Sequence, residues 1–321
     1  MAKLLEYNAT LVERQDLTDK LAVFRVRPDG GVPGEGAWFV PGQYMVIGLN
    51  NETKPELGRV QRPMSIASPP EQRDPIDFYI RYVDHPESEN PLTHLLWEIK
   101  GGARMYARVH ATGKFTIRDT VGEDDDRLLI FVAAGTGLAP FLSMVESDLL
   151  RDPRADLSRY VMIHGASYSA DLGYRDRLEQ LAKENGLKYL PTVSRAHQEQ
   201  NFEGTAGRAE DFFKADRLAD FEAAIGLGPG ELTPNRAQIL ICGLQGTIGT
   251  TITRLLGRGF IPDNRKMRKA LDVPDSLKAD VFYEAYDTTP PIDVKDEALV
   301  ASLKDTLAAG LAYAGRQGAS A

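Results

Sequence analysis

Residues 127–140, RLLIFVAAGTGLAP, combine an apolar run, two glycines one residue apart and a proline. The run RLLIFVAA predicts a buried strand, and PFLSMVESDLL, from Pro140 on, predicts an amphipathic helix. Glycines between a strand and a helix let the backbone approach a ligand, and the free amides of a helix N-terminus favour negative charge. Pro140 suits the first helical turn, where its missing N–H costs little. The spacing is not GxGxxG, and a plain strand-to-helix turn is the alternative.

Similar strand and helix patterns follow this unit in alternation. YVMIHGA precedes YRDRLEQLAKENG, LKYLPTVSR precedes AEDFFKADRL, and QILICG precedes TTITRLLGRG. Alternating βα units predict a parallel sheet with helices on both faces. We therefore expect an α/β domain over residues 127–286.

The first third of the chain has a different pattern. Short β-like runs such as KLAVFRVRP, YMVIGL, IDFYIRYV and ARMYARV are separated by glycine- and proline-rich turns, and NPLTHLLWEI is the one helical interruption. Strands at this spacing predict an antiparallel barrel or sandwich over residues 1–121. The acidic stretch 122–126, GEDDD, reads as the linker between the two domains.

Residues 287–321 form a third segment. TTPPIDVKD predicts an extended connection, and the helix that follows carries Leu299, Leu303, Leu307 and Leu311 at intervals of four residues. Such a stripe usually packs on its own domain. The alternatives are a lid over the ligand site, a surface that docks a partner, and a contact in a homo-oligomer.

Composition excludes several classes of protein. Of the 321 residues, 42% are hydrophobic and 26% are charged, which is typical of a soluble globular chain, and no apolar stretch approaches the length of a membrane span. The N-terminus lacks the pattern of a signal peptide, so we expect a cytoplasmic protein. One cysteine, Cys242, cannot form an intrachain disulfide or hold an iron–sulfur cluster, and we expect no metal site. A net charge of −8 argues against nucleic-acid binding.

Three more motifs lie where ligands bind in such domains. Cys242-Gly243 follows the strand QILI, at an edge where open α/β sheets bind ligands. Ser194-Arg195 follows a strand and Gly207-Arg208 precedes a helix, so the two arginines could hold a phosphate. A buried structural cysteine and two solvated arginines are the alternatives.

In the barrel half, RPMSIAS (62–68) places an arginine and a serine three residues apart in a predicted strand. Because side chains alternate along a strand, Arg62 and Met64 point one way and Pro63 and Ser65 the other. One segment could therefore present a cation and a hydroxyl to different parts of a large ligand.

These motifs, in this order, resemble the ferredoxin-NADP(+) reductase family, especially its bacterial flavoprotein branch. The resemblance covers about residues 5–286. Arg62-Pro63-Met64-Ser65 is similar to the family's Arg-x-Tyr-Ser flavin motif, and Tyr79-Ile80-Arg81 with Pro91-Leu92-Thr93 is similar to its flavin pyrophosphate region. The motifs similar to its pyridine-nucleotide half are residues 135–141, His164-Gly165, residues 192–195, Gly207-Arg208 and Cys242-Gly243.

The resemblance implies an N-terminal FAD-binding barrel, an NADP(H)-binding α/β domain, and hydride transfer between NADP(H) and flavin N5. Arg62 would bind the flavin pyrophosphate, and Ser65 would hydrogen-bond near N5. The cofactor-binding residues that it implies are Arg62, Pro63, Met64, Ser65, Tyr79, Ile80, Arg81, Leu92, Thr93, Gly135, Thr136, Gly137, Pro140, Ser194, Arg195, Arg208, Cys242, Gly243, Ala285 and Tyr286. Ser65, Cys242 and Tyr286 would line the site of hydride transfer.

The chain departs from the family pattern in three places. Met64 replaces the tyrosine that stacks on the flavin, so a thioether would pack there. Ala285 and Tyr286 are similar to residues that bacterial members place against the flavin near their C-terminus, but here the chain continues for 35 residues. Glu199 and Glu203 make the segment between Arg195 and Arg208 acidic, which weakens the case for a 2′-phosphate site.

The implied partner is a ferredoxin or a flavodoxin, which takes electrons one at a time. Such carriers are usually acidic, and the basic residues that could meet one are Lys100, Arg104, Arg108, Arg258, Arg265, Lys266, Arg268 and Lys269. A solvated charge run is the alternative. The alternative enzyme is the NAD(P)H-dependent reductase component of an oxygenase system, and an alternative of another class is a flavin-binding regulatory protein.

Overall fold

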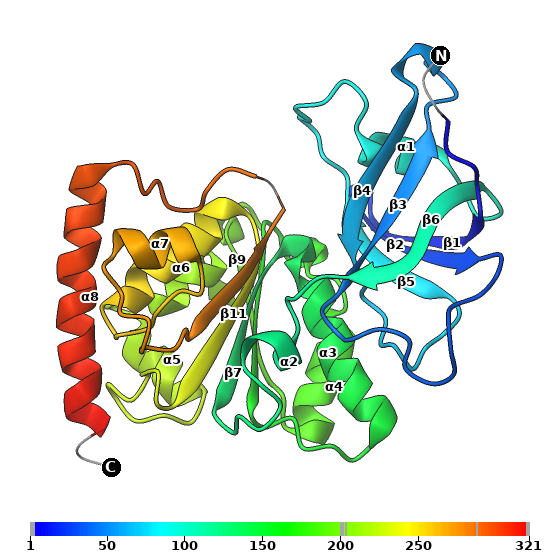
Figure 1. Cartoon of the computed structure of the whole chain (residues 1–321). Coiled ribbons are helices and arrows are strands. Elements are labelled where there is room, and N and C mark those ends of the chain that lie inside the picture. The colour runs from blue at the N-terminus through cyan, green and yellow to red at the C-terminus, as the bar shows by residue number, and fades with distance from the viewer. Residues whose placement is uncertain (1–3, 200–201, 203, 287, 319–321) are drawn as a thin grey trace. The chain divides into compact units, whose positions relative to one another are not determined.

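The computed structural model describes residues 4–199, 202, 204–286 and 288–318. The chain forms two compact units, the first from residues 1–119 and 138–155 and the second from residues 120–137 and 156–321. Each unit contains one six-stranded sheet (Figure 1). The predicted order of an antiparallel domain followed by a parallel α/β domain and a C-terminal helix is confirmed.

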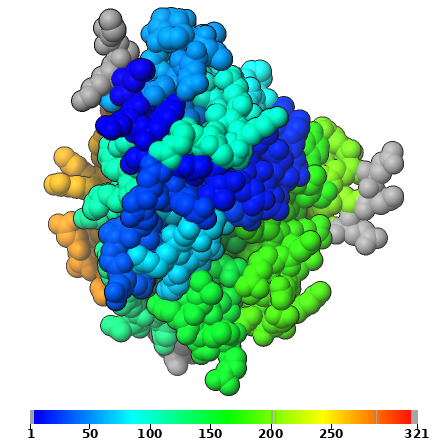
Figure 2. All heavy atoms as spheres, turned by 90° about the vertical axis from the view of Figure 1, so that its right-hand side faces the viewer, coloured from blue at the N-terminus to red at the C-terminus, as the bar shows by residue number. Residues whose placement is uncertain are grey.

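The first unit is an antiparallel barrel. Its strands are β1 (Ala9–Thr18), β2 (Leu21–Pro28), β3 (Tyr44–Asn50), β4 (Arg59–Ser65), β5 (Ile76–Arg81) and β6 (Arg104–Thr112). They pair in the order β4-β3-β6-β1-β2-β5, and an antiparallel bridge between Ile66 and Phe78 joins the two ends of this order. Apolar side chains such as Phe24, Ile47 and Phe78 fill the interior. Blue and cyan residues of this unit fill the middle of Figure 2.

Four helical segments accompany the barrel strands. They are η1 (Pro55–Leu57), α1 (Leu92–Glu98), α2 (Ile117–Thr120) and α3 (Leu138–Arg151). On α3, the Ser143 hydroxyl donates to the Ser68 carbonyl at 2.9 Å and the Ser147 hydroxyl to the Glu71 carboxylate at 2.9 Å. These contacts group α3 with the barrel, although the predicted domain boundaries at 121 and 127 place it in the second domain. The assignment of FAD and NADP(H) to these two domains stays a prediction.

The second unit has a parallel sheet. Its strands are β7 (Leu128–Ala134), β8 (Tyr160–Ala166), β9 (Lys188–Val193), β10 (Thr205–Ala206), β11 (Ala237–Gly243) and β12 (Val281–Ala285). The order is β10-β9-β8-β7-β11-β12, and every neighbouring pair is parallel. The carboxyl ends of all six strands therefore lie at one edge of the sheet.

Helical segments lie between these strands, and one helix follows the last of them. They are η2 (Gly135–Gly137), η3 (Ser169–Asp171), α4 (Arg175–Asn185), η4 (Ala196–Gln198), η5 (Ala209–Phe213), α5 (Leu218–Ala224), α6 (Gln245–Leu256), α7 (Arg265–Ala270) and α8 (Glu297–Gly318). The prediction of one helix over AEDFFKADRL was wrong, because η5 ends at Phe213 and α5 begins at Leu218. Phe213 and Phe221 come from these two pieces and pack edge to face at 5.3 Å, which needs the chain to turn between them.

The C-terminal extension packs on the second unit. Leu303 and Leu307 of α8 are 3% exposed and join the same apolar core as Leu256 of α6. The two helices approach closely at Gly310, where a Cβ would lie 2.0 Å from the Leu256 carbonyl oxygen. The Tyr313 hydroxyl donates to the Gly230 carbonyl at 2.6 Å. The leucine stripe is therefore a packing surface within the chain, and the proposed homo-oligomer contact has no support.

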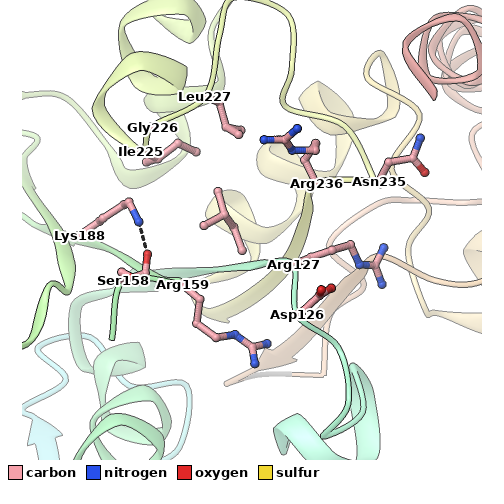
Figure 3. A pocket seen from close by; sticks show the side chains of 11 residues that line it. Asp126, Arg127, Ser158, Arg159, Lys188, Ile225, Gly226, Leu227, Asn235 and Arg236 are labelled. Carbon is pink, nitrogen blue, oxygen red and sulfur yellow. Dashed lines mark hydrogen bonds between the residues drawn. The ribbon is translucent and has the colours of Figure 1, made fainter. Parts of the chain in front are cut away.

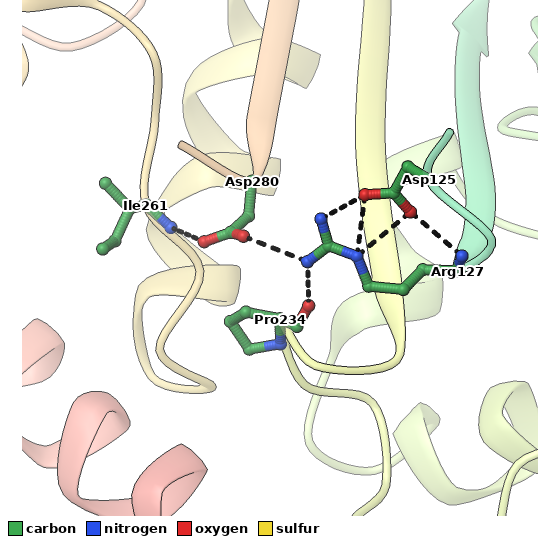
Figure 4. Close-up of polar contacts among 5 residues, drawn as sticks. All are labelled: Asp125, Arg127, Pro234, Ile261 and Asp280. Atoms are coloured by element: carbon green, nitrogen blue, oxygen red, sulfur yellow. Dashed lines mark hydrogen bonds and ion pairs between the residues drawn. The ribbon is translucent and has the colours of Figure 1, made fainter. Parts of the chain in front are cut away.

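A partly buried polar network joins the amino-terminal ends of β7 and β12 (Figure 4). The Arg127 side chain bonds to the Asp125 carboxylate and to the Pro234 carbonyl, and lies 3.7 Å from the Asp280 carboxylate. Asp280 also accepts from the Ile261 backbone N–H at 3.3 Å. Burial nevertheless raises the pKa of Asp280 to about 6. Desolvation therefore outweighs the nearby guanidinium.

The packing of α8 predicts unequal effects for its leucines. Leu303→Ala and Leu307→Ala should each lower the free energy of unfolding by about 2–5 kcal/mol, because each leaves a cavity in the core. Leu299, which is 37% exposed, is the matched control, and Leu299→Ala should cost less than about 1 kcal/mol. Urea denaturation measures all three. Equal small losses at all three positions would show that α8 is not packed in solution.

Asp280 predicts a specific pH dependence of stability. Because its pKa is about 6 in the folded protein and 3.8 ordinarily, the folded state holds a proton between these values that the unfolded state has lost. This contribution is complete below about pH 4 and is lost as the pH rises to about 6. The unfolding free energy of the wild type minus that of Asp280→Asn should fall by about 2–3 kcal/mol from pH 4 to pH 7. The exposed Asp124→Asn is the control, and a pH-independent difference for Asp280→Asn would contradict the assignment.

Candidate functional site

Glycines bring two strand ends together at the carboxyl edge of the parallel sheet. Ala133 of β7 pairs with Cys242 of β11, and each strand continues into a glycine turn. A Cβ at Gly137 would lie 2.0 Å from the Cys242 carbonyl oxygen. At Gly243, where φ is +144°, a Cβ would lie 2.7 Å from that of Ala134. Since no larger residue fits these contacts, the sequence signals at GTG and CG are two halves of one packed feature.

The predicted residues Thr136, Cys242 and Tyr286 converge at this feature. The Cys242 thiol lies 3.8 Å from the Tyr286 hydroxyl, and the Thr136 side chain hydrogen-bonds with the same hydroxyl. Ala285 lies beside Gly243, because β12 pairs with β11. Cys242 is fully buried, and this burial raises the pKa of its thiol well above the ordinary value. The thiol is therefore protonated near neutral pH and is no nucleophile.

The surface around these residues is open and partly apolar. A Cβ built at Gly135, where φ is +57°, or at Gly246 meets no atom within 4 Å. The side chains of Leu244 and Tyr286 are 64% and 47% exposed. An exposed aromatic ring beside a glycine turn offers a flat apolar surface, on which a planar ring can stack.

Arg195 lies at the same edge, after β9. Its guanidinium donates to the Tyr168 hydroxyl at 3.0 Å and lies 5.3 Å from the centre of the Tyr168 ring. The backbone N–H of Ser194 donates to the Ala166 carbonyl, which ties this turn to the end of β8. Arg195 is exposed, so its guanidinium has donors left for a ligand.

Arg208 precedes η5 and is also exposed. Its guanidinium lies 3.9 Å from the buried Glu210 carboxylate. The Thr192 hydroxyl donates to the Thr205 and Gly207 carbonyls at 3.0 and 2.9 Å, which holds the residues before Arg208 against β9. Glu199 accepts from the Ser169 backbone N–H at 2.6 Å, so that carboxylate has a structural partner. Glu203 lies outside the described residues.

In the first unit, the predicted flavin motif occupies β4. Arg62, Met64 and Ser65 lie opposite Ile47, Met45 and Tyr44 of β3. Met64 packs against the barrel core, whereas Arg62 and Pro63 are exposed and Ser65 is half-buried. Tyr79 and Ile80 are buried in β5, and Arg81 ends that strand half-buried.

Two polar groups of this unit have capacity for a ligand. Arg62 is exposed, and the one hydrogen bond that the described residues give its side chain is to the Gln61 carbonyl at 2.8 Å. The Thr93 hydroxyl, in the first turn of α1 after Leu92, is buried and has no hydrogen-bond partner among the described residues. A buried hydroxyl without a partner is costly, and a bound phosphate oxygen would satisfy it. These residues therefore fit a phosphate-bearing cofactor.

Sequence reasoning did not identify Tyr168 and Leu244 as site residues. Tyr168 follows β8 and Leu244 follows β11, so their positions just after strands could have identified them. The predicted Pro140 lies in the first turn of α3, as its sequence position indicated.

Comparisons with known proteins agree with this geometry. Residues 131–251 match the family model of the oxidoreductase NAD-binding domain. The chain is 30% identical over 220 residues to the ferredoxin–NADP reductase of Pseudomonas aeruginosa, covering 65% of this chain and 74% of that protein. The chain belongs to the ferredoxin-NADP reductase family. It is therefore an oxidoreductase, and this family consists of flavin-dependent NAD(P)H reductases.

Two further similarities help to define the family. The reductase component DmpP of the Pseudomonas phenol 2-monooxygenase is 26% identical over 260 residues, covering 80% of this chain and 64% of that protein. The crystal structure of a ferredoxin NADP+ reductase from Neisseria gonorrhoeae with bound FAD and NADP has a TM-score of 0.67 at 21% identity, covering 87% of this chain and 98% of that one. The second similarity supports the fold alone.

The part of the chain that the structure describes bears on two further expectations, which concern metal binding and membrane spans. No group of three or more His, Cys, Asp or Glu side chains there could hold a metal ion. No helix there is both long enough and apolar enough to cross a membrane. The cytoplasmic location expected from the sequence stays a prediction.

The burial of Cys242 predicts that its thiol is inert in the folded protein. Iodoacetamide at pH 8 should label it only as fast as the chain unfolds, because the thiol is enclosed and its pKa is raised. Mass spectrometry of the intact chain measures the labelling, and the same chain in urea is the control that should react fully. Stoichiometric labelling of the native protein within minutes would contradict this environment.

Proposed function

We propose that this chain is an FAD-dependent reductase that exchanges a hydride with NADP(H) and passes single electrons to a ferredoxin or flavodoxin. The main support is the convergence of Thr136, Cys242 and Tyr286 at the glycine-built edge of the parallel sheet. Arg195 and Arg208, exposed at the same edge, supply the positive charge that the 2′-phosphate of NADP(H) needs.

Each cofactor would be held by residues with capacity for it. In the first unit, Arg62 and Thr93 would bind the pyrophosphate of FAD, and Ser65 would orient the isoalloxazine ring. In the second unit, the residues around Gly135 would bind the pyridine nucleotide. When bound, FAD accepts a hydride and releases electrons singly, so the protein needs no acid or base of its own.

The protein's own contribution at the second site is placement and exclusion of water. Tyr286 is held by Thr136 and Cys242, and we propose that its exposed ring occupies the place where a nicotinamide would stack. A hydroxyl held by two hydrogen bonds can exchange them for bonds to water at a small net cost. We therefore infer that Tyr286 moves when the nicotinamide binds. The neutral Cys242 thiol then adds no charge beside the transferred hydride.

Basic residues on α7 support docking of an acidic carrier. Arg265, Lys266 and Lys269 are exposed. Other residues in the predicted set are engaged within the chain: Arg258 forms an ion pair with buried Glu222, and Arg104 forms one with Asp29. Arg268 donates to the Leu277 carbonyl at 2.7 Å. The docking proposal therefore rests on fewer cations than the sequence offers.

A reductase component of an oxygenase system is the second candidate. The similarity to the phenol 2-monooxygenase reductase component favours it, but the chain covers 64% of that protein. The single cysteine cannot hold a plant-type iron–sulfur cluster, which needs four. The choice of nicotinamide separates the two candidates.

Anaerobic titration tests the cofactor part of the proposal. The visible flavin bands should bleach at much lower concentrations of NADPH than of NADH, because two arginines favour the extra phosphate. Arg195→Gln and Arg208→Gln should each raise the NADPH requirement about 10-fold or more and leave that for NADH almost unchanged. Arg118→Gln, at an exposed arginine of α2, is the matched control.

Three outcomes, two from this titration and one from the rate of flavin reduction, would count against the proposal. Preference for NADH would favour the oxygenase component, and a colourless protein that FAD cannot reconstitute would exclude both candidates. Ser65→Ala that kept its FAD and the full rate of flavin reduction would exclude the role given to Ser65.

Carrier docking predicts an effect of charge on α7. Reversing Lys266 and Lys269 to glutamate should raise the KM for ferredoxin about 10-fold at low ionic strength and less in high salt, because screening weakens surface attraction. Reduction of ferricyanide, a small acceptor, should not change. Lys183→Glu on α4 is the control. A KM for ferredoxin that neither the reversal nor salt alters would rule out electrostatic docking by α7.

A further inference from the structure

A pocket lies at the opposite edge of the parallel sheet from the glycine turns. It has a volume of about 480 Å³ and is lined by residues at the amino-terminal ends of β7, β8 and β9 and before β11 (Figure 3). β7 has seven residues, so roughly 20 Å of strand separate this pocket from the glycine turn at the carboxyl edge. None of the residues implied in cofactor binding lines it.

Cations dominate the wall of this pocket. Arg127, Arg159, Lys188 and Arg236 line it, and Asp126 is the one acidic side chain among the described lining residues. Arg127 is already paired with Asp125 and Asp280. In a chain with a net charge of −8, three further cations around one cavity point to an anionic ligand.

Arg159 is the clearest sign of a missing partner. Its Nε and Nη2 atoms are buried and have no hydrogen-bond acceptor among the described residues. The guanidinium lies 5.6 Å from the centre of the Tyr160 ring, which holds it from one side. A buried guanidinium nitrogen without an acceptor costs free energy that a carboxylate or phosphate oxygen would recover.

The other charges near the pocket leave this need unmet. Asp125 acts on Arg159 through space, but its carboxylate is hydrogen-bonded to Arg127. Asp156 acts on Lys188 through space, but it accepts from the Ser158 backbone N–H at 2.8 Å. Lys188 donates to the Ser158 carbonyl, and burial lowers the pKa of its ammonium group. The carboxylates of Asp125 and Asp156 are thus already in use.

Another part of the wall is apolar. Leu128, Ile225 and Leu227 line it, and the last two are 1% and 6% exposed. Between them, Gly226 has φ of +83°, and a Cβ built there meets no atom within 4 Å. The absence of a side chain at Gly226 leaves room beside these apolar groups. The pocket can therefore hold a hydrocarbon body as well as an anionic head.

We propose that this pocket is a binding site for a small organic anion, with a phosphate or carboxylate head at Arg159 and an apolar body against Leu128 and Ile225, while Arg236 adds positive charge to the wall. Such a site is separate from the coenzyme site, so its ligand and NADP(H) bind together.

Calorimetry with two probes tests this site. Phenyl phosphate and benzoate are titrated into the FAD-reconstituted protein, with and without saturating NADP+, and benzyl alcohol is the neutral analogue. At least one anion should bind, with the same Kd whether or not NADP+ is present, and benzyl alcohol should not. Tighter binding of phenyl phosphate identifies a phosphate head, and tighter binding of benzoate a carboxylate head.

Substitutions of the pocket arginines test whether the anion binds in this pocket. Arg159→Gln should weaken binding of the anion about 10-fold or more, and Arg236→Gln, at an exposed side chain, should weaken it several-fold. Arg154→Gln, at an exposed arginine outside the lining, is the matched control.

Three results would overturn the proposal: no binding of either anion up to about 10 mM, unchanged affinity in both pocket variants, or competition with NADP+. Failure of NADP+ itself to bind, with anion binding kept, would count against the proposed function and not against this site.

Discussion

The close approach of Gly137 to the Cys242 carbonyl is the constraint on which the second unit depends. A Cβ at Gly137 would lie 2.0 Å from that oxygen, closer than non-bonded atoms approach, so only glycine lets η2 rest on the end of β11. The same contact fixes where β7 ends beside β11. Thr136, Cys242 and the residues of β12 meet because of it, although they are distant in sequence.

The two edges of the sheet differ in how they are built. At the carboxyl edge, glycines have no side chain to fill the space, so the surface around Gly135 is open. Tyr286 is exposed beside it. At the amino-terminal edge, charged groups crowd together: Asp280 is buried at a cost that raises its pKa, and Arg159 lacks acceptors. Clusters of buried charge and glycines at strained positions both lower the stability of the folded chain. Proteins retain such features where ligands bind.

Much of the fold follows from local patterns in the sequence. The apolar run before GTG, the alternation of strands and helices, and the stripe at Leu303 and Leu307 each act over a few residues, which is why they predicted the sheet and α8. Contacts between distant residues could not be read in this way. The serines of α3 meet the barrel at Ser68 and Glu71, and Arg258 meets Glu222, through pairings that only the folded chain creates. The candidate site follows the same rule. Its glycines could be identified from the sequence, but the contact of the Arg195 guanidinium with the Tyr168 ring could not.

Anaerobic rapid mixing of the FAD-reconstituted protein with NADPH, for the wild type beside Gly137→Ala, measures whether this glycine contact is needed for hydride transfer. If the contact between Gly137 and Cys242 builds the nicotinamide site, NADPH reduces the wild-type flavin rapidly. The variant, whose barrel is untouched, keeps its FAD but is reduced at least about 100-fold more slowly, a loss of about 3 kcal/mol. Equal rates of flavin reduction in the two proteins would show that the contact between Gly137 and Cys242 does not build the nicotinamide site.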